Sequence, residues 1–165
     1  MAVAQQPISI LVLGIGNLVM SDDAVGAIVA QRLQYNYRFP DNVEVVDGGT
    51  LGLDLLPKLE NITNLIMIDA VETGQKAGSC VRLSGQELPI ALETKISPHQ
   101  MGLKDLLAVS RLMGHSPREM VLLGVQPGSI EMELGLTPEV EAVLDTLIFN
   151  VLTELANLEV VVIPV

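Results

Sequence analysis

Aromatic, cysteine and basic residues are all scarce in this chain, and each shortage narrows its range of functions. Phe, Trp and Tyr make up 2% of the 165 residues, so the chain lacks the side chains on which single-stranded nucleic acids stack. Nine Lys and Arg residues are scattered among twenty Asp and Glu, and the net charge is −11. Because binding to nucleic acid needs clustered basic side chains, we expect no nucleic acid partner.

Cys80 is the single cysteine, which excludes an internal disulfide and a cysteine-based zinc cluster. We expect a buried structural thiol, because Cys80 lies in a strand-like stretch with no basic neighbour closer in sequence than Arg82 to activate it. Gly-x-Ser-x-Gly, His-Glu-x-x-His and phosphate-loop motifs are missing as well. Hydrolysis by this chain would therefore have to use water, activated by a metal ion or a carboxylate.

Long apolar runs are also missing. Asp, Glu, Lys or Gly interrupts each run well before the roughly 20 residues that a membrane span needs. Residues 1–7 contain no Lys or Arg, unlike the start of a secretory signal peptide. Because hydrophobic residues make up 49% of the chain, it is not a disordered protein. We expect one cytoplasmic domain over residues 1–165, without a membrane partner, and a monomer because no coiled coil is evident.

Strand-like and helix-like segments alternate along the chain. This alternation predicts a three-layer α/β/α sandwich around a mostly parallel sheet of about five strands, in which the fourth strand can run antiparallel. The expected strands are Ser9–Leu13, Val43–Val46, Leu65–Ile68, Ser79–Leu83 and Met120–Val125. The expected helices run from Ser21 to Tyr37, over Leu51–Leu59, over Leu103–Met113 and from Thr137 to Leu155, followed by an extended tail, Val160–Ile163.

The first strand ends at a glycine turn that leads to two adjacent acids. Gly14-Ile15-Gly16-Asn17 lacks the third glycine of a dinucleotide-binding fingerprint, because position 19 is Val19. Ser21 can cap the next helix, and Asp22 and Asp23 fall in its first turn, where the helix dipole favours negative charge. Residues adjacent in a helix point about 100° apart, so we expect only one of the two acids to face a site.

Polar residues also stand at the ends of other strands. Asp47 and Asp69 come directly after apolar runs, and His99 follows in a loop able to reach the same edge of the sheet. Two carboxylates and an imidazole suit a divalent metal ion with open coordination positions, and they also suit acid–base chemistry. The alternatives are that Asp69 caps a loop, that the Asp22–Asp23 pair complements the helix dipole, and that His99 is structural.

Five segments carry these residues: Gly14-Ile15-Gly16-Asn17 with Ser21-Asp22-Asp23, Asp47-Gly48-Gly49-Thr50-Leu51-Gly52, Ile68-Asp69-Ala70, Lys95-Ile96-Ser97-Pro98-His99-Gln100-Met101-Gly102-Leu103 and Gly135-Leu136-Thr137-Pro138. In this order and spacing they resemble a hydrogenase maturation protease over nearly the whole chain. The resemblance implies an aspartyl-type endopeptidase that removes a short C-terminal extension from the [NiFe] hydrogenase large-subunit precursor, after nickel has been inserted.

The resemblance also implies roles for particular residues. Asp23, Asp69 and His99 match the family's metal-binding and catalytic positions, and they would complete the coordination of nickel that the precursor already carries. Another divalent metal could substitute for nickel. Asp23 stands where the family often has Glu, which is one methylene longer. Asp47 could support the site or act as a general base. The segment that begins at Asp47 is more similar to proteases of uptake-type hydrogenases than to those of soluble bidirectional enzymes.

Two other functions share parts of this pattern. A peptidyl-tRNA hydrolase also begins with an apolar strand and Gly-x-Gly-Asn, but it needs a catalytic histidine and a basic surface, where this chain has Asp22-Asp23 and a net charge of −11. A non-proteolytic nickel-binding maturation chaperone or scaffold would use the same ligands as the protease. Only an assay for cleavage separates it from the protease.

Overall fold

A five-stranded sheet with the strand order β3-β1-β4-β6-β5 forms the centre of the protein. The computed structural model describes residues 6–49, 52–85, 87–88 and 98–165, of which residues 98–103 are described by their backbone alone. The strands of this sheet are β1 (Ile10–Ile15), β3 (Val43–Gly49), β4 (Asn64–Ala70), β5 (Cys80–Ser84) and β6 (Glu119–Val125). All pairs in this sheet are parallel except β5 with β6, so the predicted mostly parallel sheet is confirmed. The direction of the fourth expected strand, which the sequence left open, is antiparallel.

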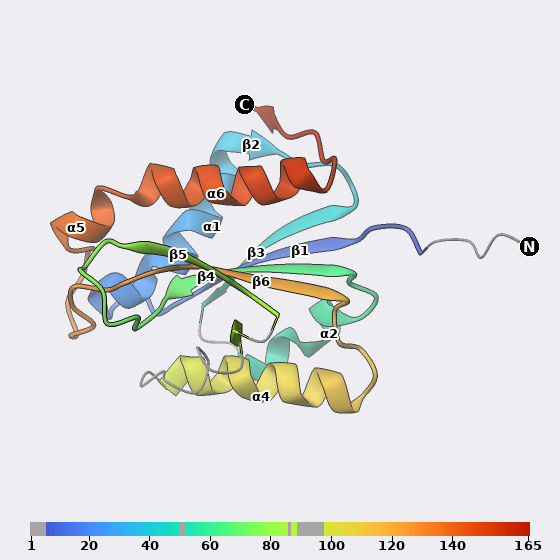
Figure 1. Ribbon diagram of the computed structural model, residues 1–165, viewed down its shortest axis with the longest axis horizontal. Coiled ribbons are helices and arrows are strands. Elements are labelled where there is room, and N and C mark those ends of the chain that lie inside the picture. Colours follow the sequence, from blue (N-terminus) through green and yellow to red (C-terminus); the bar gives the residue numbers. More distant parts are fainter. Residues whose placement is uncertain (1–5, 50–51, 86, 89–97) are drawn as a thin grey trace, which may run out of the picture.

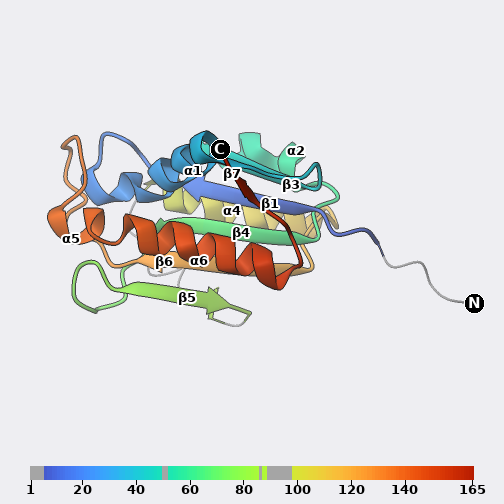
Figure 2. The ribbon, with the colours of Figure 1, turned by 90° about the horizontal axis from the view of Figure 1, so that it is seen from above.

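Helices cover both faces of this sheet (Figure 1). One face carries α1 (Val25–Asn36) and α6 (Leu144–Asn157), and the other carries η2 (Gly52–Leu55), α2 (Leu56–Leu59) and α4 (Pro98–Leu112). The predicted three-layer α/β/α sandwich is therefore confirmed. Figure 2 shows β5 at one edge of the sheet.

The burial of β1 on both faces shows why this strand of the central sheet is an uninterrupted apolar run in the sequence. Ile10 and Val12 point into the core beneath α1 and α6, whereas Leu11 and Leu13 point into the core beneath α2 and α4. All four side chains are buried. Full burial of such a side chain contributes roughly 1.5–3 kcal/mol, so a strand with both faces covered favours apolar residues at every position.

Two strands extend beyond their predicted ends. β3 continues to Gly49 and β4 to Ala70, so that Asp47 and Asp69 lie within the strands rather than after them. Pairing with a neighbouring strand explains the extension, since Asp47 lies opposite Gly14 and Asp69 opposite Gly124. The backbone of each acid is therefore held by the sheet itself.

The helices differ more from the prediction. The segment Ser21–Ala24 is a 3-10 helix, η1, and α1 begins only after it. α4 begins at Pro98 rather than Leu103, which puts His99 in its first turn and not in a loop. The predicted C-terminal helix is split into α5 (Pro138–Glu141) and α6. No helix within the described ranges is long and apolar enough to span a membrane.

A second, small sheet joins the end of the chain to the end of α1. It consists of β2 (Tyr37–Arg38) and β7 (Ile163–Pro164), which pair antiparallel. The sequence pattern predicted an extended tail over Val160–Ile163 but gave no sign of β2. Two residues are too few to show a strand pattern.

Candidate functional site

The carboxyl ends of β1 and β4 mark the point where the order of strands changes direction. From β1 the chain crosses to β3 on one side, and from β3 it crosses to β4 on the other side of β1. The helices of these two crossovers, α1 and α2, lie on opposite faces of the sheet (Figure 1). In open α/β sheets a binding crevice forms outside the strand ends at such a point. Asp23, from η1 after β1, and Asp69, near the end of β4, are both carried there.

Asp69 is fully buried near the end of β4. Its Oδ1 accepts a hydrogen bond of 2.8 Å from the backbone N–H of Ala70. Side chains alternate along a strand, so Asp69 shares a face with Leu65 and Met67, which pack in the core beneath α2 and α4. Asp69 therefore lies on the face of the sheet that α4 covers.

Asp23 is 1% exposed and is the third residue of η1. Its Oδ2 accepts a long hydrogen bond of 3.4 Å from the backbone N–H of Asn17, in the turn that ends β1. η1 is in contact with β4, the strand that carries Asp69. The sequence-based prediction that these two acids converge on one edge of the sheet therefore agrees with the placement of their elements.

Glycines allow η1 and α1 to lie directly against the strands. A Cβ on Gly16, whose φ is +152°, would lie 1.9 Å from the backbone oxygen of Asp23. A Cβ on Gly26 would lie 2.1 Å from the backbone oxygen of Ile68, the residue before Asp69. The glycines bring the two acid-bearing elements together.

Asp22 has a different role from the predicted one at the helix start. Its carboxylate is fully buried and accepts four hydrogen bonds from the loop that joins β6 to α5. The backbone N–H groups of Gly128, Ser129 and Thr137 donate at 2.7, 3.1 and 2.7 Å, and the Thr137 hydroxyl donates at 2.8 Å. Asp22 therefore holds this loop in place. The Thr137 hydroxyl donates its hydrogen bond to Asp22 and does not cap α5.

Ser21 also binds this loop rather than capping a helix. Its φ is +49°, in the left-handed region, and its hydroxyl donates a 3.0 Å hydrogen bond to the backbone oxygen of Glu131. Its backbone N–H donates to the backbone oxygen of Glu133 at 2.9 Å. These long-range partners lie about a hundred positions away in sequence, so no local pattern reveals them.

Asp47, the proposed supporting group, is half-buried in β3. Its Oδ1 accepts a 3.1 Å hydrogen bond from the N–H of Gly49, and its Oδ2 accepts one of 2.8 Å from Nε2 of Gln31 on α1. The side chain is therefore oriented by two donors and remains accessible to solvent. Of its segment, Thr50 and Leu51 lie outside the described residues.

The third predicted ligand, His99, lies in the first turn of α4, and its side chain is outside the described part of the chain. Figure 1 shows the start of α4 at the same edge of the sheet as the ends of β1 and β4. Lys95, Ile96 and Ser97 also lie outside the described residues. Among the residues that are described, no group of three His, Cys, Asp or Glu side chains could hold a metal ion.

Gln126 is a positioning residue that the sequence pattern did not reveal. It is 5% exposed, and its Oε1 accepts hydrogen bonds from the backbone N–H and the hydroxyl of Thr73 at 2.6 and 2.9 Å. Its Nε2 donates to both carboxylate oxygens of Glu72 at 3.0 Å. Gln126 thus holds the loop that leaves β4 after Asp69. A single Gln after an apolar strand belongs to no motif, so sequence alone gave no signal.

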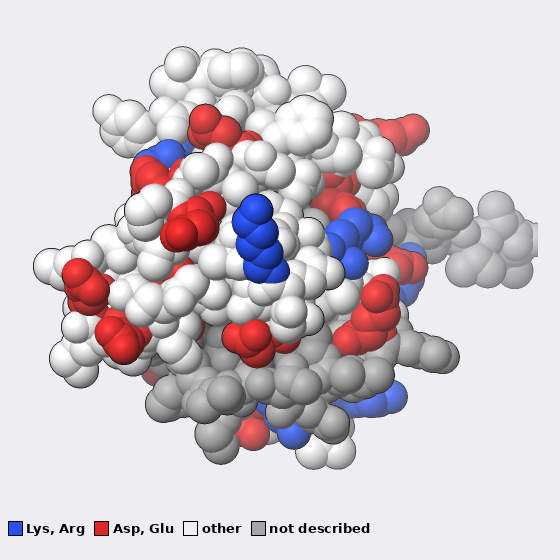
Figure 3. Space-filling model, turned by 60° about the vertical axis from the view of Figure 1, so that its left-hand side comes forward, with Lys and Arg blue, Asp and Glu red and all other residues white. Residues whose placement is uncertain are grey.

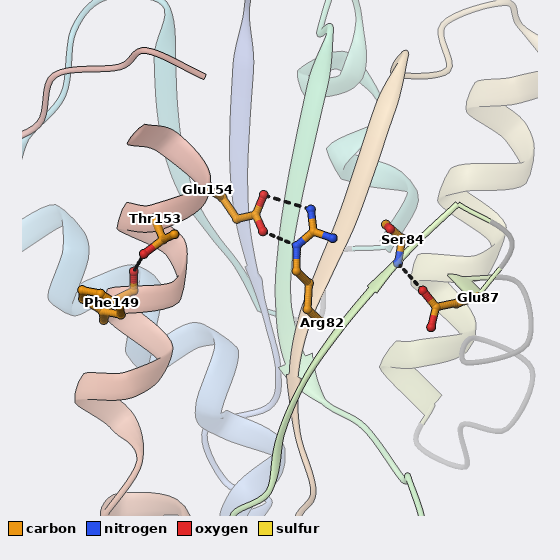
Figure 4. A network of polar contacts seen from close by, with 6 residues as sticks. All are labelled: Arg82, Ser84, Glu87, Phe149, Thr153 and Glu154. Atoms are coloured by element: carbon orange, nitrogen blue, oxygen red, sulfur yellow. Dashed lines mark hydrogen bonds and ion pairs between the residues drawn. The ribbon is translucent and has the colours of Figure 1, made fainter. Parts of the chain in front are cut away.

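Two cavities that neither Asp23 nor Asp69 lines lie along the groove between α6 and β5. Two adjoining cavities of about 380 and 240 Å³ share Arg82 and Glu154 as lining residues. Both nitrogens Nε and Nη2 of Arg82 donate to the Glu154 carboxylate, as Figure 4 shows. This hydrogen bonding raises the pKa of the Arg82 guanidinium further above its already high value. The groove therefore holds an ion pair in which the Arg82 side chain is 56% exposed and the Glu154 side chain is 15% exposed.

Cys80 lies in the same groove and is half-buried, which corrects the prediction of a buried thiol. Desolvation raises the pKa of its thiol above the usual range. At neutral pH the side chain is therefore a protonated thiol, which is a poor nucleophile. This agrees with the sequence-based conclusion that the protein uses no cysteine nucleophile.

Comparisons of the sequence with known proteins point to one family. A family model described as hydrogenase maturation protease matches residues 27–154. The chain is 42% identical over 156 residues to the hydrogenase 2 maturation protease of Escherichia coli K12, an overlap of 94% of this chain and 95% of that protein. It is 39% identical over 154 residues to the hydrogenase expression/formation protein HupD of Rhodobacter capsulatus, covering 92% of this chain and 73% of that one.

Solved structures lead to the same family. The hydrogenase maturating endopeptidase HybD of E. coli superposes with a TM-score of 0.90 at 40% identity, covering 95% of this chain and 98% of that one. The [NiFe] hydrogenase maturation protease HybD of Thermococcus kodakarensis superposes with a TM-score of 0.74 at 26% identity, covering 88% and 98%. The likeness to both extends over almost the whole of those chains.

Proposed function

Because this chain belongs to the hydrogenase maturation protease family, and is therefore a peptidase, we propose that its substrate is the large-subunit precursor of a [NiFe] hydrogenase. In this proposal the protein is an aspartyl-type endopeptidase that removes the precursor's C-terminal extension once nickel has been inserted. The hydrogenase is of the uptake type, an assignment that rests on the Asp47-Gly48-Gly49-Thr50 segment.

The main support for the proposal is that Asp23 and Asp69 are both buried on neighbouring elements, at the point where the order of strands in the sheet changes direction. Carboxylate oxygens and an imidazole nitrogen suit a borderline divalent ion such as nickel. We assign Asp23, Asp69 and His99 the role of ligands that complete the coordination of the nickel carried by the precursor. Another divalent ion in the precursor would be bound by the same three groups.

The catalytic roles follow from the same placement. Nickel in the precursor would polarise the scissile carbonyl or lower the pKa of an attacking water. Asp23 and Asp69 would hold the precursor's metal site against the edge of the sheet, and rigid strands and glycine contacts would keep their positions. Asp47 is half-buried and is oriented by Gln31 and Gly49, so it remains in contact with water, as a supporting group or general base must. It would act from the α1 side of the sheet, whereas Asp69 lies on the α4 side.

The decisive experiment incubates the purified protein with nickel-loaded and with nickel-free precursor, and follows the mass of the large subunit. Loss of a C-terminal fragment only from the nickel-loaded precursor is the expected result. Binding of the precursor without any change in mass would overturn the proposal in favour of a nickel-binding maturation chaperone or scaffold. Cleavage of both precursors at equal rates would overturn recognition of nickel but not the protease activity.

Single variants test the assigned ligands. Asp23→Asn, Asp69→Asn and His99→Ala should each lower the rate of processing by about a hundredfold or more, the usual effect of losing a catalytic group. Asp41→Asn and His115→Ala are matched controls, because Asp41 is exposed and His115 half-exposed, both toward the opposite end of the sheet. If all three ligand variants process the precursor at the control rate, the site assignment is wrong.

A further inference from the structure

We propose that the turn 17–20 and the loop 128–137 form a docking surface for the precursor, a role that rests on the proposed function. We call this surface the docking rim. It consists of the exposed side chains of Leu18, Val19, Ile130, Glu131, Met132, Glu133 and Leu134. The segment of the precursor that binds there carries apolar side chains flanked by Lys or Arg.

Large apolar side chains of the docking rim face solvent. Met132 is 82% exposed and Leu134 is 79% exposed, and Leu18 and Val19 are each 46% exposed. Single exposed apolar residues are ordinary on a protein surface, but several gathered on two adjoining loops are typical of a protein–protein contact. The turn 17–20 and the loop 128–137 lie side by side in both views (Figures 1 and 2).

Two buried residues that directly follow the turn, Ser21 and Asp22, bind the loop of the docking rim. Asp22 accepts four hydrogen bonds from the loop, and Ser21 donates to the backbone oxygens of Glu131 and Glu133. These bonds hold the backbone beneath Met132 in place while its side chain stays exposed. An apolar surface that is already ordered loses less conformational entropy on binding, which suits a docking site.

Charge identifies the chemistry of the partner. All nine Lys and Arg residues lie between positions 32 and 118, so the segments 1–31 and 119–165, which supply the docking rim, contain none. These two segments contain half of the twenty acidic residues of the chain. Figure 3 shows acidic side chains spread over the face turned forward there, with basic side chains in only a few places. Such a surface attracts a basic segment and repels an acidic one, including a second copy of this chain.

The position of the docking rim relates it to the proposed active site. Asn17 begins the turn and donates its N–H to Asp23, while Ser21 and Asp22, which bind the loop, directly precede Asp23 in sequence. A precursor bound to the rim would thus lie beside the carboxylate that we assign to its nickel. Docking at the rim and recognition of the nickel would together position the scissile bond of the precursor next to Asp23.

The test compares rim variants with matched variants elsewhere. We expect Met132→Ser with Leu134→Ser, and separately Glu131→Lys with Glu133→Lys, to raise the KM for nickel-loaded precursor by about tenfold and to leave kcat within twofold. The charge variant should also lose most of the salt dependence of binding. Leu112→Ser with Met113→Ser is the apolar control, because these residues are exposed at the end of α4. Asp41→Lys with Glu60→Lys is the charge control, because both residues are exposed.

The possible outcomes separate the two proposals. If the rim variants process the precursor with an unchanged KM while Asp23→Asn is inactive, the docking rim is wrong and the proposed function stands. If the wild-type protein binds the precursor without cutting it, the proposed function fails, and the dissociation constants of the rim variants still test the rim. If sedimentation shows a dimer that Met132→Ser with Leu134→Ser dissociates, the rim contacts a second copy and the proposal is overturned.

Discussion

The strand ends that carry Asp23 and Asp69 and the groove between α6 and β5 are both polar regions, yet they are built in opposite ways. At the strand ends the acids are buried, and backbone N–H groups and close glycine contacts hold them and their neighbours. In the groove the Arg82 side chain, which is 56% exposed, forms an ion pair with the Glu154 side chain, which is 15% exposed, beside two cavities (Figure 4). Burying an acid costs free energy, and a partner of opposite charge offsets part of that cost. The two regions therefore differ in what holds their charged groups: backbone donors and close packing at the strand ends, and a charged partner in the groove.

The largest expected effect comes from Gly26, a glycine of α1 that packs against the ends of β1 and β4. Gly26→Ala should destabilise the protein by about 3 kcal/mol or more, because the new Cβ would lie 2.1 Å from the backbone oxygen of Ile68 and the rigid backbone cannot yield. Urea denaturation followed by circular dichroism measures the change. Gly124→Ala should cost less, because its closest contact, at 2.6 Å, is a side-chain carbon of Val71. Equal effects of the two variants would contradict this explanation.

Asp22→Ala should have the next largest effect. It leaves three backbone donors, of Gly128, Ser129 and Thr137, without their acceptor, and we expect a loss of about 2–4 kcal/mol in the free energy of unfolding. Hydrogen exchange should show faster exchange across the loop 128–137 before the rest of the protein is affected. Asp145→Ala on α6 is an exposed control. If Asp22→Ala lowers the free energy of unfolding by no more than Asp145→Ala does, the hydrogen bonds of Asp22 do not stabilise the loop.

The ion pair of the groove should matter much less. Arg82→Ala is expected to change the free energy of unfolding by about 1 kcal/mol or less, because Arg82 is 56% exposed and water in the adjoining cavities can solvate Glu154 in its place. Processing of the precursor should stay at the wild-type rate, since Arg82 points toward α6 whereas Asp69 lies on the opposite face of the sheet, which α4 covers. A fall in processing equal to that of Asp69→Asn would place the active site in the groove.

The smallest expected effect concerns Cys80 in the same groove. Because burial raises the pKa of its thiol, iodoacetamide should modify native Cys80 more slowly at neutral pH than it modifies the urea-unfolded chain. The difference should narrow as the pH rises through the raised pKa, where the native thiol also ionises. Faster reaction of the native protein at neutral pH would mean an activated cysteine, and the assumption of a water nucleophile would then fail.

Much of the fold could be predicted because its causes are local. Continuous apolar strands, such as the one around Leu11 and Leu13, and their alternation with helices were sufficient to predict the layers and the parallel sheet. Element ends were predicted less well, since pairing with Gly14 and Gly124 carries β3 and β4 through their acids. The start of α4 at Pro98 was also missed, because the pattern of apolar residues begins only at Leu103.

The candidate site residues could be named from the sequence alone: Asp47 and Asp69 lie in the last residues of apolar strands, Asp23 follows the turn after another, and His99 follows later in the chain. The family resemblance in these segments agrees with the comparisons, while the ligand roles stay predictions. The family resemblance had already assigned Asp23 rather than Asp22 to the metal, but what Asp22 binds is visible only in the folded chain, where it accepts four hydrogen bonds from a loop more than a hundred positions away. The physical reason is distance along the chain. Local patterns report propensity and burial, but they do not report which remote backbone groups need an acceptor.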